Sequence, residues 1–503
     1  MSERLRLAAV DLGAESGRVV LGRFDGERVD LEVVRRFANQ PVWLPDGLHW
    51  TLPTLFCETL AGLGAAASSG RLDGIGIDAW GCDYALLDGG GRMLGLPFHY
   101  RDARTSSEVV ARAHARVGRE ELYRRTGIQT MPINTIYQLT AEADGAAASV
   151  AERIALVPDL FGLWLTGTLV NELTVASTTG LLEAHGRSWA EDLVRRLGLP
   201  ARPFAGTVTD PGVEIGRVLH QHAGAAGAAV GAHVHTVGGH DTASAFAAAP
   251  MSGTHGAVLS SGTWSLLGVE LDQPELGPDA SVCNLTNERG LAGTVRLLRN
   301  VMGLWLVQEC RRAWLARGVH HEYDELQQLA AAARPDVPVF DPDHDSLLHA
   351  GADMPARIAA LCGAGGQSPP DGDGELVRAI LVSLACKYRL VLEHLEGVSR
   401  RRIDTVHVVG GGARNHLLCQ LTADLLQRQV VAGPVEATAL GNVLVQALAA
   451  GELADLVQLR RVVARSVTVR RHEPGPAAAA QHVYHRFLTA TGRLAPGAIP
   501  AHV

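Results

Sequence analysis

The sequence predicts an α/β fold made of two halves that share one plan. Short apolar segments ending in glycine-rich loops alternate with longer helical patterns along most of the 503 residues. A strand, a glycine-containing turn and a returning strand occur near the N-terminus and again just after the midpoint. A chain of this length can form two or three domains with sizeable cores. We therefore expect two α/β domains with a ligand cleft between them.

The first half begins with a hairpin. An apolar strand enters the glycine-containing turn, and a second strand returns from it. Another apolar strand begins at Gly74 and runs out to a polar end at Asp83. Two helical stretches follow later. The expected elements are strands at 7–10, 19–24 and 74–83, a turn at 11–18, and helical segments at 135–151 and 153–165.

The second half repeats this order before its pattern weakens. A hairpin is followed by a long amphipathic helix, then by a strand that ends in three glycines and leads into a helix. The expected elements are strands at 257–259, 265–269 and 405–409, a turn at 260–263, a surface loop at 363–372, and helices at 376–396, 416–426 and 437–450. From about Gly451 the pattern is lost, which suggests a peripheral tail.

Composition excludes several classes of protein. The formal net charge of -8 and the absence of a basic arm argue against nucleic-acid binding. No apolar run reaches the roughly 20 residues of a membrane span, and no secretory signal follows Met1. The seven cysteines are scattered without a Cys-x-x-Cys pair, as in reduced proteins of the cytoplasm. We expect a cytoplasmic protein without nucleic-acid or membrane partners, either a monomer or a small homo-oligomer.

Three loops share glycines and small hydroxyl residues directly after an apolar strand. Such turns expose backbone N–H groups, and glycine lets phosphate oxygens approach the main chain. In the first loop, Asp11 precedes the turn and Arg18 closes it, so a carboxylate beside phosphate indicates Mg²⁺ held largely through water. The second loop, Ser261–Thr263, offers amides and hydroxyls to further phosphates. The third, Gly410–Gly412, leaves a flat surface for a purine.

The midpoint of the chain carries the candidate catalytic carboxylate. Two glycines at 238 and 239 precede Asp241, which stands at the start of a small-residue helix, 243–249. One interpretation is a helix N-cap, because Asp is a good capping residue. The other is a base that orients an acceptor hydroxyl and takes its proton during phosphoryl transfer. The residues around Asp241 leave both open.

Other nucleotide-binding and catalytic motifs do not fit. The chain has no G-x-x-x-x-G-K-[ST] phosphate loop, no His-Glu-x-x-His and no G-x-S-x-G. Gly74-x-Gly76-x-x-Ala79 matches the dinucleotide fingerprint formally, but its glycines lie inside a strand and no helix follows. His320-His321-Glu322 reads as an exposed cluster at a helix start, not as a metal site.

These motifs resemble those of the FGGY-family carbohydrate kinases, within the actin-like ATPase superfamily. The similarity is greatest to the branch that phosphorylates L-rhamnulose. The matching strings span residues 8 to about 445: AVDLGAESGRV, GIDAWGCDY, GLPFHYRDART, YRRTGIQ, GHDTASA, LSSGTWSLLG, RNVMGLWLVQE, VVGGGARN and GPVEATALGN. The resemblance implies two ribonuclease-H-like domains, 1–248 for sugar and phosphate and 249–455 for nucleotide, with 456–503 as a peripheral tail.

The resemblance also implies the roles of particular residues. ATP phosphates would lie near Ala14, Glu15, Ser16, Gly17, Arg18 and Thr263, the nucleotide near Gln308, and adenine near Gly411. The sugar would contact Gly81, His240, Asp241, Thr242 and Asn300, with Asp241 as proton acceptor. Asp11 matches the acid linked to the metal. Glu15 departs from relatives that carry Ser, and its carboxylate would add negative charge near the phosphates.

The implied activity is ATP- and Mg²⁺-dependent phosphorylation of L-rhamnulose to L-rhamnulose 1-phosphate and ADP, in L-rhamnose breakdown. One alternative is a kinase of the same fold for another ketose, L-fuculose or L-xylulose. A second is a protein that binds sugar or ATP without transferring phosphate, because the fold alone does not separate these classes. A carboxylate at position 241 favours the kinases, since a binding protein needs no acceptor base there.

Overall fold

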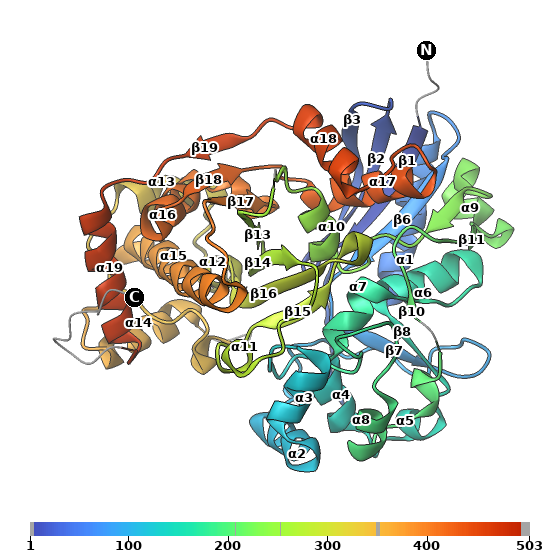
Figure 1. Cartoon of the computed structure of the whole chain (residues 1–503), viewed down its shortest axis with the longest axis horizontal. Coiled ribbons are helices and arrows are strands. Elements are labelled where there is room, and N and C mark those ends of the chain that lie inside the picture. Colours follow the sequence, from blue (N-terminus) through green and yellow to red (C-terminus); the bar gives the residue numbers. More distant parts are fainter. Residues whose placement is uncertain (1–4, 207, 252, 349–352, 494–503) are drawn as a thin grey trace. The chain divides into compact units, whose positions relative to one another are not determined.

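The computed structural model describes residues 5–206, 208–251, 253–348 and 353–493. The chain forms two compact units, and each consists of three separate segments. Unit 1 contains Met1–Pro250, Glu270–Leu298 and Glu436–Val467, and unit 2 contains Met251–Val269, Arg299–Val435 and Thr468–Val503. Figure 1 shows sheets with helices packed against them, which confirms the α/β prediction.

Unit 1 is built on a six-stranded sheet of order β11–β12–β6–β1–β2–β3. β1 is antiparallel to β2 and parallel to β6, so the predicted N-terminal hairpin is confirmed. Strands β12 and β6 are also parallel. The sheet strands are β1 (Leu5–Leu12), β2 (Ser16–Phe24), β3 (Val29–Ala38), β6 (Gly74–Ala79), β11 (Glu214–Arg217) and β12 (His233–His235).

Two helices cover opposite faces of this sheet. Gly22 of β2 lies against Val443 of α17 (Ala437–Ala449), because a Cβ at Gly22 would stand 2.7 Å from the Val443 methyl groups. Val19 of the same strand lies against Gly62 of α1 (Leu52–Ala67). Successive strand residues point to alternate faces. Positions 19 and 22 therefore bury the two faces, and α17 comes from a segment more than 400 residues further along the chain.

The remaining helices of unit 1 surround the sheet and a second apolar core. That core joins β7 and β8 to the helices between residues 107 and 197, seen at the bottom of Figure 1. The helices are α2 (Ser107–Val117), α3 (Arg119–Thr126), α4 (Thr135–Glu142), α5 (Ala146–Val150), α6 (Val157–Thr166), α7 (Leu173–Ala176), α8 (Glu191–Arg196), α9 (Ala223–Ala226), α10 (Asp241–Ala247), α11 (Pro278–Val282) and α18 (Leu456–Ser466).

The expected helices at 135–151 and 153–165 need correction. Residues 135–151 form two helices, α4 and α5, separated by a turn at Gly145. Residues 153–156 form strand β8, which pairs antiparallel with β7 (Tyr84–Leu87), and α6 begins only at Val157. The other short strands of unit 1 are β4 (Val42–Leu44), β5 (Gly47–His49), β9 (Asn171–Glu172), β10 (Val208–Thr209) and β15 (Thr286–Arg289).

Unit 2 repeats the same strand plan. Its strands belong to the seven-stranded sheet of order β15–β16–β14–β13–β17–β18–β19, whose edge strand β15 is in a segment of unit 1. Its central strand β13 is antiparallel to β14 and parallel to β17, as β1 is to β2 and β6. The strands are β13 (Gly256–Ser261), β14 (Trp264–Leu271), β16 (Val295–Met302), β17 (Thr405–Val409), β18 (Gln429–Ala432) and β19 (Arg470–His472). The repeat predicted from the two hairpins is therefore present.

Unit 2 contains one long and largely buried helix, α15 (Gly372–Ser399), on which most of its other helices pack. The prediction of a helix at 416–426 matches the bounds of α16. Residues 456–490, where the sequence showed no pattern, form α18, β19 and α19. The helices of this unit are α12 (Trp305–Ala316), α13 (Tyr323–Ala332), α14 (Met354–Ala364), α15, α16 (His416–Leu426) and α19 (Ala477–Ala490).

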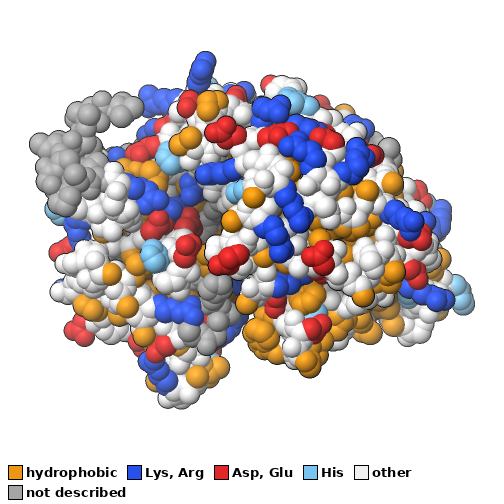
Figure 2. All heavy atoms as spheres, turned by 90° about the horizontal axis from the view of Figure 1, so that it is seen from below, with side chains coloured by type: hydrophobic (Ala, Val, Ile, Leu, Met, Phe, Trp, Pro, Cys, Tyr) orange, Lys and Arg blue, Asp and Glu red, His pale blue; other side chains and the backbone are white. Residues whose placement is uncertain are grey.

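Three further observations concern the surface, the helices and the cysteines. On the face drawn in Figure 2, basic and acidic side chains are interspersed. Within the described ranges, every helix falls short of the length and apolarity that crossing a bilayer demands. All seven cysteines lie in those ranges, and no disulfide joins any two of them.

Candidate active site

The first hairpin places two carboxylates and one guanidinium side by side. Asp11 is opposite Arg18 in the β1–β2 ladder and level with Asp78 in the β1–β6 ladder. Arg18 Nη2 donates to Asp11 Oδ2 at 2.6 Å, and Arg18 Nε lies 3.2 Å from Glu436 Oε2. The Asn442 side-chain amide donates to Asp78 Oδ2 at 2.6 Å. Asp11 and Asp78 are buried.

Burial and mutual repulsion dominate the electrostatics here. Burial raises the pKa of Asp11, although the neighbouring Arg18 opposes the rise and the Asp241 charge adds to it. Burial also raises the pKa of Asp78 well above its usual range, and the Asp11 charge adds to that effect. Burial lowers the pKa of Arg18, but the neighbouring carboxylates of Asp11 and Glu436 raise it by more. The net effect is a raised pKa, so the guanidinium stays charged. Negative charge exceeds positive charge at this edge.

This charge excess is compatible with a divalent cation held mainly through water. Asp11, Asp78 and Asp241 are hard oxygen donors and sense one another electrostatically. Among the described residues, however, no three His, Cys, Asp or Glu side chains are grouped closely enough to hold a metal ion directly. A closed cage of protein ligands is therefore not formed here. The residues fit Mg²⁺ whose coordination is completed by water and phosphate.

The expected phosphate-binding residues lie at the tip of the first hairpin. Ala14, Glu15 and Ser16 are partly exposed there, and the tip is closed by a hydrogen bond from the Gly13 N–H to the Ser16 carbonyl. A Cβ at Gly17 would stand 2.2 Å from the Phe37 ring. Packing against Phe37 is thus enough to explain the glycine at position 17. This glycine is therefore not in itself a sign of phosphate binding.

The loop before α10 presents His240 and Asp241. His240 is the N-cap residue, and Asp241 is the first residue of the helix. The capping interpretation of Asp241 is therefore wrong. A carboxylate at that position is stabilised by the helix dipole. The Thr242 hydroxyl donates to Asp241 Oδ1 at 3.0 Å, and the Asp241 side chain remains 29% exposed.

Buried polar groups hold the backbone before Asp241. Glu172 accepts the Gly239 N–H at 3.1 Å and the Thr174 hydroxyl at 2.7 Å. The Thr174 hydroxyl in turn accepts the His240 N–H at 3.1 Å. A Cβ at Gly239 would lie 2.7 Å from Glu172 Oε2, so glycine is required there by close packing. Burial raises the pKa of Glu172 to about 7.

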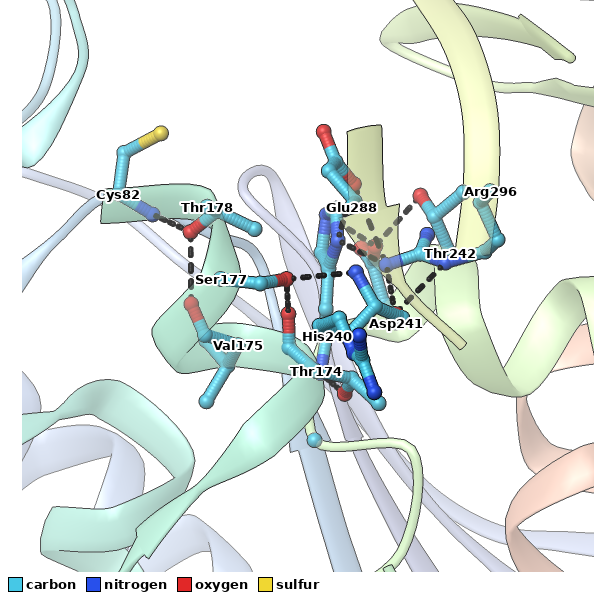
Figure 3. Close-up of polar contacts among 12 residues, drawn as sticks. Cys82, Thr174, Val175, Ser177, Thr178, His240, Asp241, Thr242, Glu288 and Arg296 are labelled. Atoms are coloured by element: carbon cyan, nitrogen blue, oxygen red, sulfur yellow. Dashed lines mark hydrogen bonds and ion pairs between the residues drawn. The ribbon is translucent and has the colours of Figure 1, made fainter. Parts of the chain in front are cut away.

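The His240 ring contacts two further charged residues, as Figure 3 shows. Its Nδ1 lies 3.0 Å from Glu288 Oε2 and 3.3 Å from Arg296 Nη2. Its Nε2 lies 3.5 Å from Asp241 Oδ1. Burial lowers the pKa of Arg296, and the charges of Glu288, Glu172 and Asp241 oppose this. Gly81, another expected sugar contact, lies beside Thr178, whose Oγ1 would be 3.1 Å from an added Cβ.

Unit 2 brings its own candidate residues together around the β13–β14 turn. The Thr263 carbonyl accepts the Trp305 N–H at 3.2 Å, and the Gly262 carbonyl accepts the Leu304 N–H at 3.0 Å. A Cβ at Gly412 would stand 2.1 Å from Ser261 Oγ, whereas one at Gly411 would meet no atom within 4 Å. Gly412 is therefore required by packing, and Gly411 faces open space.

The other two expected residues of unit 2 lie on neighbouring elements. Asn300 is on β16 and Gln308 is on α12. Gln308 Oε1 is buried and has no hydrogen-bond partner among the described residues. The expected residues thus fall into two groups. Asp11, the 14–18 tip, Gly81 and residues 240–242 belong to unit 1, while Thr263, Asn300, Gln308 and Gly411 belong to unit 2.

Several residues that shape the site were not assigned from the sequence. Asp78 and Asn442 lie in strings that match the family, yet only the strand register shows that Asp78 is level with Asp11. Glu172 and the pair of Glu288 and Arg296 lie outside all of those strings. The last two face each other across the β15–β16 ladder. The sequence signal that could have indicated this pair is a glutamate and an arginine at facing positions of a predicted β-hairpin.

Comparisons with known proteins identify the family. Residues 7–247 match the N-terminal domain, and residues 257–450 the C-terminal domain, of the FGGY family of carbohydrate kinases. A protein of Bacteroides thetaiotaomicron named rhamnulokinase is 40% identical over 483 residues, covering 95% of this chain and 98% of that protein. A rhamnulokinase of Klebsiella pneumoniae strain 342 is 41% identical over 476 residues, covering 93% and 94%.

Solved structures agree on the fold. The xylulose kinase of Rhodospirillum rubrum superposes with a TM-score of 0.75 at 21% identity, covering 98% of this chain and 99% of that one. The gluconate kinase of Lactobacillus acidophilus gives 0.77 at 16% identity, covering 98% and 100%. Both domain matches together span most of the sequence. The chain therefore belongs to the FGGY family of carbohydrate kinases.

Proposed function

We propose that this chain transfers the γ-phosphoryl group of ATP to the 1-hydroxyl of L-rhamnulose, giving L-rhamnulose 1-phosphate and ADP. Relatives about 40% identical over nearly the whole length carry the name rhamnulokinase. The structural observation that supports a transfer reaction is Asp241. It is partly exposed at the start of α10, and its neighbour His240 is anchored by buried groups.

In the proposed reaction, Asp241 is the base. The hydroxyl oxygen of the sugar forms a bond to the γ-phosphorus, the bond from that phosphorus to the β–γ bridging oxygen breaks, and the hydroxyl proton passes to Asp241. Gly81, His240, Thr242 and Asn300 would hold the sugar so that this oxygen is in line with the phosphorus.

The remaining candidates would hold the nucleotide. Residues 14–18 and Thr263 would bind phosphate oxygens, Gln308 would contact the nucleotide, and the open face at Gly411 suits the adenine ring. Asp11 would hold Mg²⁺ through water, and the bound ion would neutralise phosphate charge. On this proposal residues 1–248 serve sugar and phosphate, 249–455 serve the nucleotide, and the enzyme acts in the cytoplasm. The family matches at 7–247 and 257–450 support this division.

A substrate panel tests the proposal. ADP release from Mg²⁺-ATP would be measured with L-rhamnulose, L-fuculose, L-xylulose, D-xylulose and glycerol. We expect a clear preference for L-rhamnulose. A preference for another ketose would keep the reaction and overturn the substrate, and no sugar-dependent release from folded protein would overturn both.

The Asp241→Asn variant tests the base. It keeps the shape of the side chain and removes its ability to take a proton, so we expect turnover to fall by at least a hundredfold, within the usual contribution of about 10²–10⁴ from general base catalysis. Nucleotide binding, followed by the fluorescence of a labelled ATP analogue, should stay within about twofold. Unchanged turnover in this variant would contradict the assignment.

A further inference from the structure

The β15–β16 hairpin carries a buried ion pair that faces the sugar side of the site. Glu288 and Arg296 are direct partners in the antiparallel ladder, where opposite side chains come close. Arg296 Nη2 lies 3.2 Å from Glu288 Oε2, and the exposed fractions of the two side chains are 0% and 5%. Two charges are seldom removed from water so completely unless each has a defined partner.

The rest of the arginine is fixed by the hairpin itself. Arg296 Nε and Nη2 both donate to the Arg289 carbonyl, at 3.1 and 3.0 Å. The guanidinium also stands over the Phe246 ring of α10, 5.7 Å from the ring centroid. Its rotamer is therefore determined by contacts that do not involve the catalytic loop. The ion pair is a rigid feature against which another side chain can be placed.

That side chain is the imidazole of His240. Glu288 Oε2 and Arg296 Nη2 both approach the same ring nitrogen, Nδ1, at 3.0 and 3.3 Å. The other nitrogen, Nε2, is directed to the side of Asp241, at 3.5 Å from Oδ1. This distance is beyond a normal hydrogen bond. One ring nitrogen is thus engaged by the protein interior, and the other is available beside the most exposed carboxylate of the site.

We propose that Glu288 and Arg296 are positioning residues for the sugar: they lock the His240 ring so that Nε2 is presented, next to Asp241, to the hydroxyls of the ketose. This inference rests on the proposed function. A histidine that could rotate would exchange its two nitrogens and change the polar group offered to the sugar, because the neutral ring has one donor and one acceptor. The ion pair removes that rotation and keeps Nε2, not Nδ1, directed to the hydroxyls of the substrate.

The test uses kinetics with both substrates. Glu288→Gln keeps the shape of the side chain and removes its charge. We expect kcat/KM for L-rhamnulose to fall at least tenfold, while KM for Mg²⁺-ATP stays within twofold. The matched control is Glu183→Gln. Glu183 also pairs with an arginine of unit 1, Arg125, but has no contact with His240. Its kinetics should match those of the parent protein.

A double-mutant cycle separates positioning from a general structural effect. In a protein that already carries His240→Asn, adding Glu288→Gln should lower kcat/KM for L-rhamnulose by less than a further twofold. The reason is that the side chain through which Glu288 acts is already absent. If Glu288→Gln lowers kcat/KM for L-rhamnulose by the same tenfold with and without His240, the inference is wrong. It is also wrong if Glu288→Gln leaves the sugar kinetics unchanged in a parent protein that phosphorylates the sugar.

A second variant separates a loss of stability from a loss of positioning. Glu288→Gln leaves the buried Arg296 cation without its carboxylate, which can destabilise the chain. Replacing both, Glu288→Leu with Arg296→Met, removes both charges and is expected to restore the thermal midpoint. This folded variant should still lose at least tenfold in kcat/KM for L-rhamnulose. Full sugar activity in it would overturn the inference. If the parent protein acts on no sugar in the panel, the proposed function fails instead.

Discussion

The contact between α10 and α17 offers a sharp test of how the catalytic loop is supported. Gly441 of α17 lies so close to α10 that a Cβ there would stand 1.9 Å from the Ser244 carbonyl oxygen and 2.6 Å from its carbon. Ser244 is fully buried, three residues after Asp241. The obstacle is backbone, which cannot rotate away, so Gly441→Ala would force the helices apart by about 1.5 Å to reach an ordinary 3.4 Å contact.

The expected cost follows from two opposing effects. Overpacking a core typically costs about 1–3 kcal/mol, and a rigid obstacle favours the upper end. Exchanging Gly for Ala within a helix returns about 1 kcal/mol. We therefore expect Gly441→Ala to lose about 2 kcal/mol, a fall of roughly 4–8 °C in the thermal midpoint. Because α10 begins at Asp241, kcat should fall as well.

Calorimetry with a matched glycine checks this reasoning. Gly397 lies in α15, is exposed, and an added Cβ would meet no atom within 4 Å. Gly397→Ala should raise the midpoint by a degree or more, since only the helix propensity changes. Kinetics of both variants would be measured at a temperature where both are folded. A Gly441→Ala protein as stable and active as its parent would refute the close packing of α10 on α17.

Two further predictions concern pH and the glycines of unit 2. Burial raises the pKa of Glu172 from 4.5 to about 7, so the folded state keeps a proton that the unfolded state loses, and stability falls as pH rises from about 4.5 to 7. The shift corresponds to about 3 kcal/mol. Glu172→Gln should flatten that part of the curve of unfolding free energy against pH, measured by urea titration. An equally steep curve in the variant would show that other groups cause the slope. In unit 2, Gly412→Ala should lower the thermal midpoint by several degrees, because its Cβ would meet Ser261. Gly411→Ala should leave the midpoint unchanged and raise KM for Mg²⁺-ATP several-fold, since its side chain enters open space. Equal effects of the two on stability would contradict this difference.

The fold was predictable where local pattern and structure agree. The glycine-rich hairpins and the helix 416–426 were found because periodicity and turn residues mark them. The segment 153–165 was misread, since an unbroken apolar run does not distinguish a buried strand from a buried helix. Only its pairing with β7 makes residues 153–156 a strand. Such pairing depends on chain nearly 70 residues away.

The candidate site divides in the same way. Asp11, Arg18 and Asp241 stand in local motifs, and the sequence pointed to each of them. The buried pair of Glu288 and Arg296 was missed, because its partner His240 is some 50 residues away. A charged residue in a short alternating segment is normally on the surface. Its burial is decided by long-range packing, which a sequence pattern does not record.

The interleaved composition of the two units has a consequence for synthesis on the ribosome. The central strand of unit 1 is among the first segments made, yet the Ala8 carbonyl accepts its side-chain hydrogen bond from Gln446, 438 residues later. At about 5–20 residues per second, β1 waits tens of seconds for α17 to emerge. The core of unit 1 is therefore completed only after α17 has been made, late in synthesis. Until then β1 lacks this packing partner, and exposed apolar strands of that kind are prone to aggregate.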